Sequence, residues 1–187
     1  MTVYGYSQAL ADAVQMLSPT GEETISRENV AASNTLTTQN LVLSYFVARH
    51  TGNINSVATA STGTAAGATP TRCQVGIYSV AANGDITLIG STANTTSLWA
   101  TINTLYTTAL SAPTPIATGS TYAVGLLVVT AATAPTVAGG PTTAPAAVQA
   151  LAPRMSGVVT GQATLPASVV SASIANTTSN PYARLIP

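Results

Sequence analysis

The chain is poor in charged residues. Only 5% of its 187 residues are charged, lysine is absent, and no charged residue occurs between 86 and 153. A typical soluble protein has about 25%. The net charge is near zero, which argues against nucleic acid or an anionic membrane as partner. Because so few charges favour association, we expect a surface of Thr, Ser and Asn, combined with burial against other copies or a larger assembly.

Cysteine and histidine occur once each, as Cys73 and His50. No intrachain disulfide can form, and Cys73 lies in an apolar alternation typical of a buried thiol. A single histidine excludes a multi-histidine metal site within one chain. We therefore expect no metal and no cofactor.

Side chains that could act as catalytic acids or bases are also few. A Ser-His-Asp triad would need His50 with Asp12 or Asp85, and neither acid lies near a nucleophile motif. Asp85 follows a tight turn, which explains it structurally. Glu22, Glu23 and Glu28 belong to a polar segment near the start, and no phosphate-binding glycine loop is present. The sequence predicts a protein that is not an enzyme.

Long apolar runs are also missing. No stretch of 18 apolar residues occurs, so we expect no membrane insertion. The first residues carry no basic region followed by an apolar core, so we expect no signal peptide.

Short β-rich runs are abundant. The clearest hairpin signal is Arg72–Val80, then Asn83-Gly84, then Asp85–Ser91, for which we expect a type I′ turn. Leu41–Ala48 is apolar on both parities, which predicts a strand covered on both faces. Further strands are expected at residues 54–59, 105–110, 122–130, 155–160 and 168–174.

This pattern predicts an all-β fold, an antiparallel β-sandwich of jelly-roll type. An immunoglobulin-like sandwich is the alternative, although the Cys-Trp-Cys arrangement is absent. Residues 131–153, rich in Ala, Thr, Pro and Gly, are expected to form an exposed loop or a contact arm.

The N-terminal region differs from the rest. Residues 7–17 have helical spacing of apolar residues, and Ser18-Pro19-Thr20-Gly21 ends it. We expect an arm or short helix over 1–35, a sandwich over 36–180 and a tail over 181–187. The short helix either packs on its own domain or docks on a neighbour. The expected assembly contacts of the arm are Tyr4, Tyr6, Leu10, Val14 and Leu17.

Several short motifs resemble the β-sandwich modules of bacteriophage virion proteins, especially those of actinobacterial phages. The residues are Ile77-Tyr78, Leu88, Trp99, Ala109-Leu110 with Pro113, Gly119 and Tyr122-Ala123-Val124-Gly125. The likeness covers about residues 41–129. It implies a decoration protein of the capsid or a minor tail component on the phage particle surface, made in the host cytoplasm. Its partners would be other virion proteins and copies of itself, with a trimer favoured, and no catalytic residues carry over.

Two other functions stay open at this point. A carbohydrate-binding or host-receptor module of a tail fibre would use exposed aromatic and amide side chains in loops. The candidate glycan contacts are Trp99, Tyr106, Asn94 and Asn103, although a core or sheet-edge anchor is the favoured interpretation of Trp99. A cell-wall hydrolase is the third function, and the scarcity of acid and base side chains argues against it.

Overall fold

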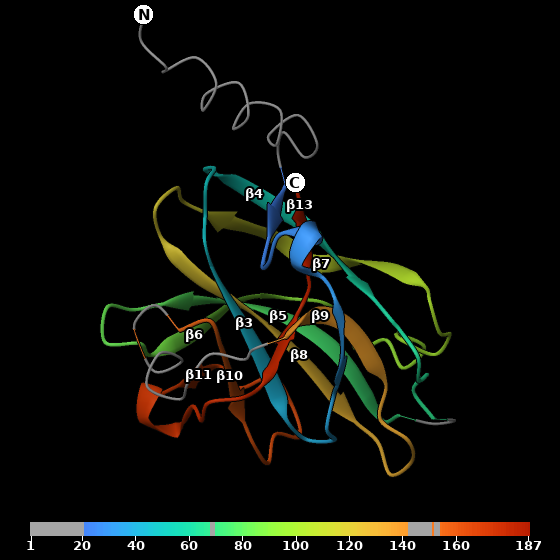
Figure 1. Cartoon of the computed structure of the whole chain (residues 1–187). Coiled ribbons are helices and arrows are strands. Elements are labelled where there is room, and N and C mark those ends of the chain that lie inside the picture. The colour runs from blue at the N-terminus through green and yellow to red at the C-terminus, as the bar shows by residue number, and fades with distance from the viewer. Residues whose placement is uncertain (1–20, 68–69, 142–150, 152–153) are drawn as a thin grey trace, which may run out of the picture.

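The computed structural model describes residues 21–67, 70–141, 151 and 154–187 (Figure 1). These residues form antiparallel β-sheets and contain no α-helix, which confirms the expected all-β, sandwich-like fold. Two short 3-10 turns occur, η1 (Arg27–Asn29) and η2 (Ser171–Ser173).

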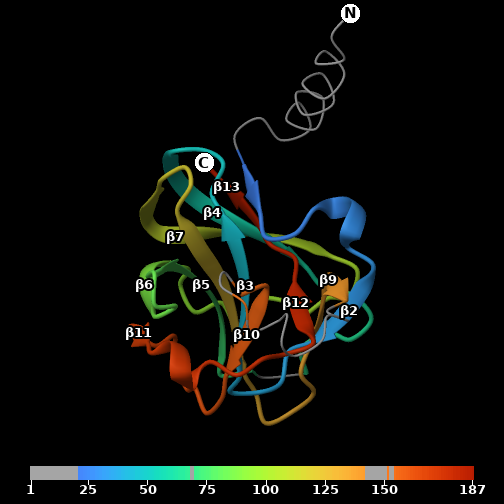
Figure 2. The same ribbon diagram turned by 60° about the vertical axis from the view of Figure 1, so that its left-hand side comes forward.

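Three sheets make up the fold. The six-stranded sheet has the order β10 (Ser156–Val159), β3 (Leu41–Val47), β8 (Thr121–Val129), β5 (Arg72–Val80), β6 (Ile86–Ser91), β11 (Ser168–Val169). The four-stranded sheet has the order β1 (Glu22–Glu23), β13 (Arg184–Ile186), β4 (Gly52–Ala60), β7 (Leu105–Ile116). The three-stranded sheet, β12 (Ser179–Pro181), β9 (Thr136–Pro141), β2 (Ala32–Thr35), lies to one side of β3 and β10 (Figure 2).

The six-stranded sheet is buried on both faces at its centre. All residues from Leu41 to Phe46 are buried, as the apolar run predicts. One face, with Val75 and Val124, packs against Val57 of the four-stranded sheet. The other face forms a second core, in which Leu43 and Tyr78 belong to the same cluster as Val159, Val169 and Ile174. Each fully buried large aliphatic side chain contributes about 1.5–3 kcal/mol, so the two cores dominate the stability of the fold.

The predicted hairpin forms, but its turn differs from the expected type I′. Gly84 has φ +85° and Asn83 is not in the left-handed region. The Gly84 amide donates to the Ala81 carbonyl at 2.8 Å, and the Ala81 amide donates to the Asp85 carbonyl at 2.9 Å. This is a three-residue loop with a type I turn and a left-handed glycine. Asn83 Oδ1 instead accepts from the Asp85 amide at 3.1 Å.

A strand lies inside the segment expected to be a loop or arm. β9 occupies residues 136–141 and pairs with β2 and β12, which corrects part of the expectation for residues 131–153. A Cβ at Gly139 would collide with the Asn34 amide and the Asn180 carbonyl, so the glycine is needed for close approach of the strands. Residues 142–150 and 152–153 lie outside the described residues.

Segments assigned to an arm and a tail belong in part to the folded body. β1 pairs with β13, and β2 pairs with β9. β13 also pairs with β4, and Leu185 is fully buried. The expected helix and the contacts Tyr4, Tyr6, Leu10, Val14 and Leu17 fall outside the described residues.

Buried ionisable groups predict a loss of stability at alkaline pH. Burial raises the pKa of Cys73 to about 11 and that of Tyr45 to about 12. A raised folded-state pKa means that the folded state holds its protons longer than the unfolded chain, so stability falls once the unfolded groups ionise. The urea midpoint should fall between about pH 8 and about pH 11. Cys73→Ala should show a smaller fall, and a midpoint that does not change with pH would contradict this prediction.

Candidate functional site

Two of the expected glycan contacts have structural tasks instead. Trp99 is 0% exposed and its Nε1 donates to Thr59 Oγ1 at 3.0 Å, so its ring offers no face to a ligand. Asn94 Oδ1 accepts from the Cys73 amide, and Asn94 Nδ2 donates to the Thr71 carbonyl, both at 3.0 Å. Asn94 therefore fastens its loop to the start of β5.

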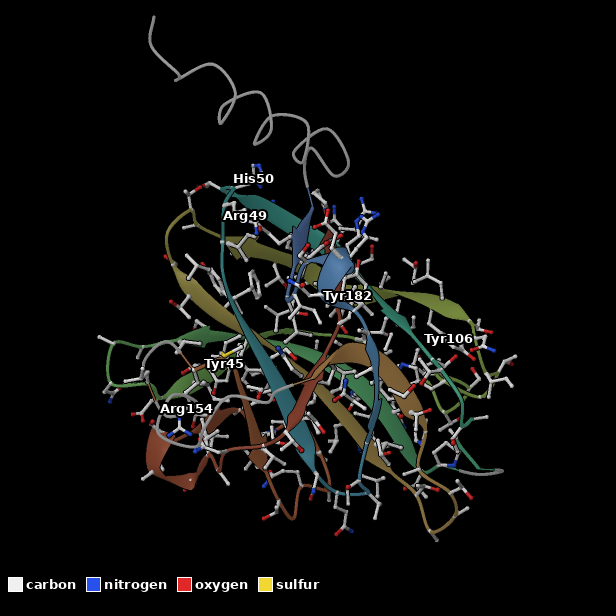
Figure 3. The ribbon with its side chains drawn as sticks, in the orientation of Figure 1. Tyr45, Arg49, His50, Tyr106, Arg154 and Tyr182 are labelled. Atoms are coloured by element: carbon white, nitrogen blue, oxygen red, sulfur yellow. The ribbon has the colours of Figure 1, made fainter. Side chains whose placement is uncertain are left out.

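The other two expected contacts lie nearer the surface. Tyr106 is half-buried on β7, and its hydroxyl accepts from the Thr101 amide at 2.7 Å. Asn103 is exposed, with φ +50°. Figure 3 shows Tyr106 on the opposite side of the molecule from Tyr45 and Arg154. The four predicted residues do not form one exposed site, because Trp99 faces the core.

The outer face of the four-stranded sheet carries a half-open groove of about 600 Å³, called here the outer groove. Residues that alternate with the core positions face outward, and the strand register brings them together: Ala58 lies opposite Thr107 and Arg184, and Ala60 lies opposite Leu105. The walls and floor comprise Arg27, Val30, Ala58, Ala60, Leu105, Thr107, Ala138, Tyr182, Arg184 and Ile186. Leu105, 67% exposed, is the most exposed large apolar side chain among the described residues.

A hydrogen-bonded polar cluster forms one rim of the groove. Arg27 Nε donates to Glu23 Oε1 at 2.6 Å, and the Tyr182 hydroxyl donates to the same oxygen at 3.1 Å. Figure 3 shows Tyr182 beside η1. The Glu23 hydrogen bond raises the pKa of Arg27, while burial, and then the charge of Glu23, raise the pKa of Tyr182. The rim therefore presents the Arg27–Glu23 ion pair together with the Tyr182 phenol.

Glu22 fixes the strand that leads to this rim. It is 2% exposed, and its Oε1 accepts from the backbone amides of Arg49 and His50 at 2.7 and 2.8 Å. His50 Nδ1 lies 3.1 Å from the same oxygen. Arg49 and His50 mark the corner between β3 and β4 (Figure 3). The polar sequence around Glu22 gave no sign of this role, because its partners are distant along the chain.

The groove combines an apolar floor with a polar edge. Small and aliphatic side chains form the floor, and a guanidinium and a phenol supply polar contacts at the edge. The only histidine, His50, is paired with Glu22, and Asp12 lies outside the described residues. Asp85 accepts from the Ser171 amide at 2.7 Å, which ties the hairpin turn to η2.

Within the described ranges, no group of three or more His, Cys, Asp or Glu side chains is placed to hold a metal ion. Over the same part of the chain, no helix is long and apolar enough to cross a membrane.

No protein-family model matches the chain, and no curated protein matches it.

Loss of the Glu22 carboxylate should destabilise the fold. Glu22→Ala leaves two backbone amides without their acceptor in a buried site, which should lower the free energy of unfolding by about 2–4 kcal/mol. Glu28→Ala, at an exposed position in the same segment, is the matched control and should change it by less than about 0.5 kcal/mol. Urea unfolding measures both variants. Equal effects of the two substitutions would show that the Glu22 contacts do not hold β1.

Proposed function

We propose that this chain is a structural bacteriophage virion protein, a capsid decoration protein or a minor tail component that assembles non-covalently on the particle surface. The observation that carries the proposal is the apolar outer groove on a chain with so few charges. A contiguous apolar surface with a polar rim is typical of a site that another protein covers.

The residues of the phage-protein resemblance support the proposal through their places in the fold. Ile77, Tyr78 and Trp99 are fully buried, and Tyr122–Val124 lies in the central strand β8. Leu110 belongs to the core between the two larger sheets. The resembling residues therefore belong to the core of a sandwich. We propose that this sandwich serves as a virion protein.

The mechanism we propose is burial of apolar surface without a chemical step. The outward-facing residues of β7 include Thr107, Ala109 and Ser111, which are exposed and uncharged. A neutral surface of this kind loses little hydration energy when covered, since no isolated charge has to be desolvated. The proposal requires no catalytic residue, cofactor, nucleic acid or membrane. The expected partners are other virion proteins and copies of this chain.

Glycan binding has less support as the second function. Trp99 is buried and Asn94 is used within its loop, so the site would depend on Tyr106 and Asn103. A single half-buried tyrosine whose hydroxyl is already bonded to Thr101 is a poor platform for a sugar ring.

Removal of the N-terminal residues should separate folding from particle binding. Deleting residues 1–30 would remove β1 and the Glu22 anchor, so the informative deletion is residues 1–20. We expect the shortened chain to keep the far-UV circular dichroism of a β-protein. It should lose co-sedimentation with particles of the encoding phage assembled without this protein, by at least about tenfold, which is the loss of about 1.4 kcal/mol or more of binding energy.

The control for this experiment is the full chain with Val170→Glu, a change at an exposed apolar residue that lies beside η2 and outside the outer groove. This variant should sediment with particles as the unchanged chain does. Undiminished particle binding by the chain without residues 1–20 would argue against an assembly role for the N-terminal region.

A further inference from the structure

We propose that the outer groove is the docking site for the N-terminal segment, residues 1–20, of a second copy of this chain. The inference rests on the proposed assembly role and names the partner for the groove. The contact is heterologous, with one segment and one groove per chain, so copies in which each segment enters the next groove form a ring where the rotation between neighbours closes.

The shape and chemistry of the groove suit apolar side chains. Its volume of about 600 Å³ suits a few large side chains, and Ala58 and Ala60 leave space above the sheet where larger residues would fill it. Leu105 stands exposed at one end, opposite Ala60. Covering Leu105 and this floor with apolar side chains would remove contiguous apolar surface from water.

Residues 1–20 have a composition that complements the groove. They supply Tyr4, Tyr6, Leu10, Val14 and Leu17 as large apolar or aromatic side chains. Their single charged side chain is the carboxylate of Asp12, with no arginine or lysine. The groove is lined by two guanidinium groups, that of Arg184 and that of Arg27, whose Nε also donates to the Glu23 carboxylate at the rim.

The chain enters the fold from the end of its own groove that lies away from Leu105. Glu22 lies opposite Leu185 and Glu23 lies opposite Arg184. Followed backwards from Glu23 to Glu22, the chain therefore runs towards the Ile186 end of β13. Leu105 lies at the other end of the groove, beyond Ala60. The chain thus leaves β1 away from the most apolar part of its own groove, which favours the groove of a neighbour.

The test uses full-length chains and light scattering after size-exclusion chromatography. The unchanged chain should form a discrete oligomer. Leu105→Glu, which places a carboxylate at the groove, and the double variant Leu10→Glu with Val14→Glu should each reduce the measured mass to that of the monomer. Val170→Glu, another exposed apolar residue (57% exposed) outside the groove, is the matched control and should keep the oligomer.

Mixing the two defective variants decides whether the segment and the groove bind each other. The Leu105→Glu chain retains an intact segment, and the double variant retains an intact groove. An equimolar mixture should therefore give a heterodimer and no larger species. A mixture that stays monomeric, or a Leu105→Glu chain that keeps the oligomer, would overturn the proposal.

Two further measurements distinguish a loss of folding from a loss of docking between copies. Trp99 is buried and bonded to Thr59 of β4, so unchanged Trp fluorescence shows that the four-stranded sheet is intact in each variant. A monomeric unchanged chain whose thermal midpoint falls on Leu105→Glu would indicate docking within one chain, which overturns docking between copies. A monomer that still binds phage particles would refute this inference alone, whereas an oligomer that binds no particles would refute the proposed function alone.

Discussion

Burial of the central strands on both faces is the constraint on which the rest of this structure depends. β3, β5 and β8 carry apolar residues on both parities, so each face needs its own cover. The four-stranded sheet covers one face, and residues 159–174 supply Val159, Val169 and Ile174 to the core on the other. The sheet that covers the first face then has an outer surface of its own, and the apolar groove lies there.

Three of the charged groups join segments that are distant in sequence. Glu22 fastens β1 to the corner after β3, Asp85 fastens the hairpin turn to η2, and Arg154 Nη1 donates to the Ile174 carbonyl at 2.8 Å. A charged group bonded to backbone amides or carbonyls gives stronger hydrogen bonds than a neutral one. With the charges used in this way, hydration of the remaining surface depends on Thr, Ser and Asn, and separate copies repel one another little.

Sequence patterns predicted the elements whose cause is local. The alternation of Cys73, Val75 and Ile77 gave β5, and the double-sided run at Leu41 gave the buried β3. What the sequence could not reveal depends on partners far along the chain. The strand β9 was not predicted, because Gly139 is required by its contacts with Asn34 and Asn180, which are distant in sequence. The sequence favoured a core or sheet-edge position for Trp99 but left a ligand contact open, because its partner Thr59 is 40 residues away. The groove exists only once β13, β4 and β7 lie side by side.

We propose that another copy of the chain covers the outer face of the four-stranded sheet. Hydrogen–deuterium exchange of the full chain, read by mass spectrometry at concentrations below and above that of assembly, tests it most directly. The account predicts that protection rises with concentration in β4, β13 and the Leu105 end of β7, and stays constant in the buried β3 and β8. Equal exchange of the groove strands at both concentrations would contradict it.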